Sequence, residues 1–116
     1  MIQINSNTKV FISPSSIDFR KGIDGIASQC QSLYKEDPFS GSLFIFKNKR
    51  GTSIKILSFD GQGFWLCQKR LSKGVYKFWP KTFIEAQSLK PHHVAVLLQN
   101  GNPFSASFQP YWRNVG

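Results

Sequence analysis

Acidic residues are scarce in this chain, which has six carboxylates among its 116 residues. A nuclease or transposase that uses two metal ions needs three carboxylates converging on one site. Asp18 and Asp37 are typical of helix-cap and turn positions, Asp60 belongs to an Asp-Gly turn, and Glu36 ends the predicted first helix. Structural roles therefore account for most of the carboxylates, and the sequence predicts a protein that is not an enzyme.

Cysteine and histidine are also few. Cys30 and Cys67 lie far apart, without the paired spacing of a disulfide framework or a zinc site. His92 and His93 are adjacent, so on a helix they point about 100° apart and cannot share a metal as an i, i+4 pair does. We therefore expect no disulfide, no metal and no other cofactor, and a reducing cytoplasm as the setting.

Long apolar runs are missing as well. The residues up to Arg20 contain no signal-peptide core, and the apolar runs elsewhere are far shorter than a membrane span. No phosphate-binding loop of the nucleotide-hydrolase type is present either. We expect a soluble protein in the cytoplasm, free or associated with the nucleoid, with no membrane partner and no small-molecule substrate.

Positive charge, in contrast, is abundant, because fifteen Lys and Arg residues give a formal net charge of +9. Nine of the fifteen lie between Lys47 and Lys81, where Asp60 is the only acid. These nine are Lys47, Lys49, Arg50, Lys55, Lys69, Arg70, Lys73, Lys77 and Lys81. A surface charged only for solubility would mix both signs. The clustering therefore indicates an acidic partner, of which nucleic acid is the commonest.

The chain length predicts one domain, because a chain of this size buries roughly 65% of its unfolded surface. Eleven Phe, three Trp and three Tyr residues favour a core built on a sheet. We expect a single α+β domain over residues 1–101. Residues 102–116 form a tail with two prolines and four aromatic rings, which is either a docked extension or a partner-binding arm.

Short apolar runs separated by turn residues predict a curved antiparallel meander of about five strands. The first strand covers Lys9 to Ile12, and four more lie between Asp37 and Pro80, with turns at Asn48 to Gly51 and at Asp60-Gly61. The segment Thr82 to Ala86 is either an edge strand or a connection.

Two helices are expected beside this sheet. Apolar residues with helical spacing predict one over Phe19 to Lys35, packed on the sheet. Its expected buried positions are Ile23, Ile26, Ala27, Cys30, Leu33 and Tyr34. Gly22 and Gly25 indicate either close packing of its N-terminus on the sheet or approach to a phosphate. A short C-terminal helix begins at Pro91 and stops near Asn100-Gly101.

The candidate nucleic-acid-binding residues come from the meander and from the start of the first helix. They are Lys47, Lys49, Arg50, Lys55, Lys69, Arg70, Lys73 and Lys77, with Arg20 and Lys21. Lys55 alternates with two isoleucines, which turns it to the opposite face of its strand. Exposed rings beside these cations would resemble a surface that holds single strands. Most rings, Trp65 and Trp79 included, are expected in the core.

Several separated motifs resemble one known family. They are Asp18-Phe-Arg-Lys-Gly-Ile-Asp-Gly-Ile26, Asp37-Pro-Phe-Ser-Gly-Ser-Leu-Phe44, Lys55-Ile-Leu57, Asp60-Gly-Gln-Gly-Phe64, Lys69-Arg-Leu71 and Trp79-Pro80. In this order they are similar to TnpB, the accessory protein of insertion sequence 66 type elements. The resemblance implies a small protein encoded beside a separate transposase and needed for efficient movement of the element. It does not extend to the longer RNA-guided nuclease that shares the name TnpB.

Two functional hypotheses follow. In the first, a non-catalytic transposition factor binds nucleic acid, with element DNA preferred to RNA, through the basic face of the meander. In the second, the chain is a protein-interaction module that docks on the transposase, with its positive charge matched to an acidic surface there.

Overall fold

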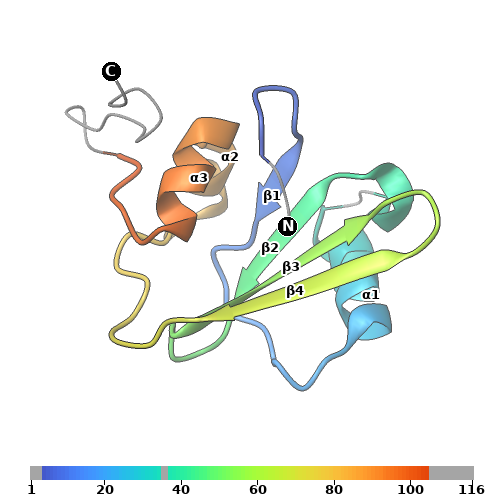
Figure 1. Ribbon diagram of the computed structural model, residues 1–116, viewed down its shortest axis with the longest axis horizontal. Helices are drawn as coiled ribbons and strands as arrows, with labels where there is room; N and C mark the ends of the chain where they lie inside the picture. The colour runs from blue at the N-terminus through green and yellow to red at the C-terminus, as the bar shows by residue number, and fades with distance from the viewer. Residues whose placement is uncertain (1–3, 35–36, 105–116) are drawn as a thin grey trace.

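The computed structural model describes residues 4–34 and 37–104, and the secondary structure in these ranges mixes helices and strands. In chain order the elements are β1 (Val10–Ile12), α1 (Ile23–Tyr34), the short 3-10 helix η1 (Pro38–Ser40), β2 (Leu43–Lys47), β3 (Ser53–Phe59), β4 (Phe64–Arg70), α2 (Phe83–Ser88) and α3 (Pro91–Leu98). Figure 1 shows the strands side by side with helices around them. The predicted α+β class is confirmed.

The sheet has the order β1-β2-β3-β4, with antiparallel pairing from β2 to β4. Two details of the expected meander are wrong. The described residues form four strands instead of about five, and β1 pairs with β2 in parallel. Helices α1 and η1 lie between β1 and β2 in the chain. They form a crossover that returns the chain to the end of the sheet where β1 begins, so β2 runs parallel to β1.

The segment expected to form the last meander strand is a loop. Two of its aromatic side chains, Tyr76 and Trp79, are buried, but its backbone does not pair with the sheet as a strand. The Tyr76 N–H donates to Gly51 O at 2.8 Å, and the Trp79 indole N–H donates to Ser13 O at 2.7 Å. These two long-range bonds fix the loop against the sheet, so its rings complete the core without a strand.

The segment Thr82 to Ala86 is neither an edge strand nor a plain connection, because it contains the first turns of α2. The Thr82 hydroxyl accepts the Glu85 N–H at 3.1 Å, and the Glu85 carboxylate accepts the Lys81 N–H at 2.7 Å. Thr82 is thus the N-cap of α2, and Glu85 binds the residue before it. The same four-residue signal is readable in the sequence.

The core has two parts, one on each face of the sheet. On one face Ile45 and Ile56 pack with residues of α2 and α3, such as Ala86 and Leu97. On the other face the side chains of the intervening positions pack with α1. That second cluster contains Ile17, Ile26, Cys30, Phe44, Phe46 and Leu57. Strand alternation thus covers β2 and β3 on both sides.

Helix α1 begins at Ile23, four residues later than expected, and the predicted last residue, Lys35, lies outside the described residues. The delay has a local cause, because Asp18 accepts the Arg20 N–H at 2.9 Å and forms a turn. A Cβ at Gly22 would meet nothing within 4 Å, and one at Gly25 would meet only the Lys21 side chain. Close packing on the sheet therefore does not explain these glycines.

Helix α3 confirms the predicted C-terminal helix, with Pro91 in its first turn. Asn100 has a φ of 61°, the left-handed conformation that ends helices. Residues 105–116, which make up most of the predicted tail, lie outside the described residues. Within the described ranges, no helix is long and apolar enough to cross a membrane.

Two residues of α1 provide a test of its orientation. Ile26 is fully buried, whereas Leu33, also expected in the core, is 39% exposed. Ile26→Asp should lose folding, because an unpaired buried charge costs several kcal/mol against a total stability of about 5 to 15 kcal/mol. Leu33→Asp should stay within about 1 kcal/mol of wild type in urea unfolding. Equal destabilisation by the two variants would contradict this orientation.

Candidate nucleic-acid interface

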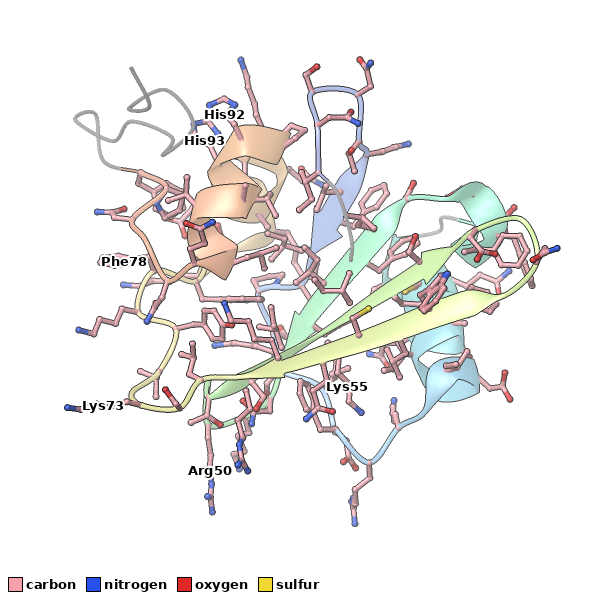
Figure 2. All side chains as sticks on the ribbon, in the orientation of Figure 1. Arg50, Lys55, Lys73, Phe78, His92 and His93 are labelled. Atoms are coloured by element: carbon pink, nitrogen blue, oxygen red, sulfur yellow. The ribbon has the colours of Figure 1, made fainter. Side chains whose placement is uncertain are left out.

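Cations from three chain segments meet at one end of the sheet, which we call the basic end. The ladder places Lys47 and Lys69 on either side of Ile54, and Arg70 opposite Ser53. The basic end comprises Lys47, Lys49, Arg50, Lys69, Arg70 and Lys73. All of these side chains are exposed except Lys47, which is half-buried. Figure 2 shows Arg50 and Lys73 pointing away from the sheet.

The turn that carries Lys49 and Arg50 is internally fixed. The Asn48 side-chain oxygen accepts the Thr52 N–H at 2.9 Å and the Ser53 N–H at 3.1 Å. Gly51 has a φ of 74°, which favours glycine, and its carbonyl accepts the Tyr76 N–H. The two cations therefore extend into solvent from a turn whose backbone is held by these hydrogen bonds.

Lys69 and Arg70 follow each other on β4, so they project from opposite faces of the sheet. Lys69 lies on the side of α3, where its ammonium donates to Leu98 O at 2.9 Å, near the negative end of the helix dipole. Arg70 lies on the side of α1. The candidate cations thus surround the end of the sheet, in contrast to the single basic face expected from the sequence.

Lys77 lies farther along the same loop and is also exposed. Its backbone N–H donates to the Asn100 side chain at 3.0 Å, and the Asn100 amide donates to Val75 O at 2.9 Å. This cation therefore stands near the C-terminal end of α3, beside the basic end.

Lys55 differs from the expectation, because its side chain is only 8% exposed. Alternation does turn it away from the isoleucines, but the face it reaches is covered by the segment before α1. Its ammonium donates to Phe19 O at 2.7 Å and to Lys21 O at 3.2 Å, and lies 4.9 Å from the Phe19 ring centroid. Lys55 fixes that segment in place and is not part of an open binding surface. Figure 2 shows it beneath the strands.

Arg20 and Lys21 occupy the segment that Lys55 holds. Arg20 is 92% exposed and forms a 2.8 Å ion pair with Asp18. Hydrogen bonds from the Arg20 side chain and backbone lower the pKa of Asp18 to about 2. Lys21 donates to the Gln29 side chain at 2.7 Å. Residues 16–19 face Asn48, Lys49 and Arg50 across a groove of about 450 Å³. Arg20 directly follows this segment and therefore lies near the basic end.

The exposed rings of the sheet lie at its other end. Phe39 is 58% exposed and packs against Phe59 and Phe64, with centroids 5.0 and 5.1 Å away. Trp65, expected in the core, is 60% exposed, and its indole N–H donates to the Asp60 carboxylate at 2.7 Å. We call Phe39, Phe59, Phe64 and Trp65 the aromatic end. Trp79, by contrast, is buried as expected.

Other chemistry finds little support among the described residues. No group of three His, Cys, Asp or Glu side chains is placed to hold a metal ion there. Burial raises the pKa of Cys30 to about 12, so this thiol is not activated as a nucleophile. His93 accepts the Lys90 N–H at 3.0 Å, and desolvation, with the charges of His92 and Lys90, lowers its pKa. The His93 side chain thus caps the N-terminus of α3 by accepting this hydrogen bond.

Residues 8–106 match the family described as IS66 Orf2 like protein, and the chain belongs to this family. Its members are the TnpB accessory proteins of IS66-type insertion sequences. The resemblance found in the sequence is confirmed.

Two relatives come from Sinorhizobium fredii. The uncharacterized protein y4hO is 33% identical over 98 residues, which cover 84% of each chain. The uncharacterized protein y4jC is 30% identical over 80 residues, which cover 69% of this chain and 68% of the relative. No solved structure matches.

The structural role of Lys55 can be tested with a matched pair of variants. Lys55→Met keeps most of the side-chain volume but removes the donor for two carbonyls. Each unsatisfied buried acceptor costs about 1 to 3 kcal/mol, so the free energy of unfolding should fall by at least that amount. Lys77→Met, at an exposed site, should change it by about 0.5 kcal/mol or less. Urea unfolding measures both, and equal stability of the two variants would refute the role.

Proposed function

We propose that this chain is a non-catalytic accessory factor of an insertion sequence that binds the element's DNA through the basic end. One observation carries the proposal, namely that six cations from three chain segments meet at one end of the sheet. A cluster of this kind attracts a polyanion, because each phosphate that it neutralises releases a counterion.

The lack of acidic partners for four of these cations supports the proposal. Among the described residues, no acidic side chain forms a salt bridge with Lys49, Arg50, Arg70 or Lys73. Their charge is not neutralised within the fold. Lys55 differs from these four because its ammonium is bound by two carbonyls, and Lys69 of the basic end also donates to one carbonyl, Leu98 O, at 2.9 Å.

The second candidate is docking on the transposase, and the aromatic end favours it. Phe39 and Trp65 are 58% and 60% exposed, so they present large apolar side chains to solvent. Interface cores are enriched in such side chains. Because the aromatic end is distinct from the basic end, this candidate predicts binding that does not fall steeply with salt.

A salt titration with two double variants tests the DNA proposal. Lys49→Ala with Arg50→Ala should weaken DNA binding and lower the slope of log K against log salt by about 0.9 for each phosphate that is no longer neutralised. The weakening should be similar on element ends and on random duplex, because phosphate contacts carry no sequence information. Melting should stay within about 1 kcal/mol of wild type.

The control is Lys81→Ala with Lys90→Ala, which removes the same charge from exposed sites outside the basic end. Fluorescence anisotropy at several salt concentrations measures both double variants. If the control weakens binding as much as the basic-end variant, only net charge matters, and the proposed location is wrong.

The Asp18–Arg20 ion pair predicts a variant with higher affinity. Asp18→Asn should strengthen DNA binding, because it removes a negative charge and frees Arg20 while keeping an oxygen for the Arg20 N–H. Asp24→Asn removes the same charge from an exposed position in the first turn of α1, without freeing a cation. The salt slope should rise by up to about 0.9 more in Asp18→Asn than in Asp24→Asn. Identical slopes would show that Arg20 does not reach the DNA.

A further inference from the structure

We infer that the basic end binds duplex DNA by phosphates of both strands and does not hold a single strand by stacking its bases. This inference rests on the proposed function and adds the form of the ligand. Surfaces that bind single strands without sequence preference combine cations with exposed rings on which bases stack. The arrangement of rings and cations in this chain can therefore discriminate between the two forms.

The exposed rings of the sheet are separated from the cations by the length of the β3–β4 ladder. Phe59 pairs with Phe64 at one end of that ladder, and Ser53 pairs with Arg70 at the other. Six residue steps in a strand span roughly 20 Å. A base stacked on Trp65 would thus lie far from Arg70 and from the turn that carries Arg50.

The rings near the basic end are buried or half-buried. Tyr76 and Trp79 are 5% and 6% exposed and pack against each other with centroids 5.8 Å apart. Phe78 packs on the core, and Phe19 is half-buried beneath the Lys55 ammonium. The other exposed rings of the described residues are Phe83 in α2, His92 in α3 and Phe104 in the segment after α3. None of these rings forms a stacking platform beside the cations.

The cations themselves are arranged for two rows of phosphate. Lys69 and Arg70 project from opposite faces of β4, with the turn cations Lys49 and Arg50 beside them. One strand following one face can neutralise only one side of this arrangement. A duplex presents phosphates on both sides of a groove and at higher charge density, so it can engage both sides together.

The turn is not suited to reading bases through a polar side chain. The Asn48 amide donates to the Thr52 hydroxyl at 3.0 Å, and its oxygen already accepts two backbone N–H groups. This side chain is occupied by the fold. Asn48 is therefore not available to read bases, and the exposed cations of the turn are left to make the contacts.

The experiment compares one labelled duplex with each of its separate strands at the same series of salt concentrations, using the full chain. Lys69→Gln and Arg70→Gln test the two faces one at a time, and Trp65→Ala and Phe39→Ala test stacking. Thermal melting of each variant checks its fold. Two ring variants are used so that one remains informative if the other fails to fold.

We expect tighter binding of the duplex than of either strand. Each glutamine variant should lower the duplex salt slope by about 0.9, and both ring variants should bind as wild type does. Equal or tighter binding of a single strand, reduced on the order of 5- to 150-fold by a ring variant, would overturn the inference but leave the proposed function standing. A duplex slope that responds to only one of the two glutamine variants would overturn the two-sided contact. Absence of salt-dependent binding to any of these ligands would overturn the proposed function itself.

Discussion

The burial of β2 and β3 on both faces is the constraint on which the rest of the structure depends. Their alternating side chains fill two separate cores, one against α1 and the other against α2 and α3. A charged side chain within these strands has no solvent to reach, so cations are confined to the strand ends and to the turn between them. The basic end is a consequence of this layering as much as of the composition.

Lys55 shows what happens to a cation that does fall inside this layer. Its side chain is largely buried, and two carbonyls of the segment before α1 accept hydrogen bonds from its ammonium. That segment carries Arg20 and lies beside the turn of Lys49 and Arg50. A buried lysine therefore positions other cations without being exposed itself.

Local signals in the sequence predict much of this fold. The apolar runs locate the central strands, and Pro91 marks the start of α3, because these features depend on neighbouring residues alone. The parallel pairing of β1 is not readable in this way, since it depends on where a long connection returns. The capping pair Thr82 and Glu85 is a local signal for α2 that the strand interpretation misses.

The candidate site follows the same division. The sequence identifies the clustered cations, and the turn geometry explains why Lys49 and Arg50 are exposed. The sequence does not show that Lys55 is buried while the other candidate cations are exposed or half-buried. Period-two alternation indicates which face of the sheet a side chain lies on, but not what covers that face. Likewise, the exposure of Trp65 depends on how far α2 and α3 extend over the sheet, which is a property of the whole fold.

The β3–β4 ladder also sets a fixed distance within the protein. The paired strands β3 and β4 are extended and hold each other in register, so their length does not change. They join the basic end directly to the aromatic end. A molecule held at one end is thus kept roughly 20 Å from a molecule held at the other. Two partners bound to one copy of this protein, one at the basic end and one at the aromatic end, would therefore be held at a fixed distance and would not compete for the same surface.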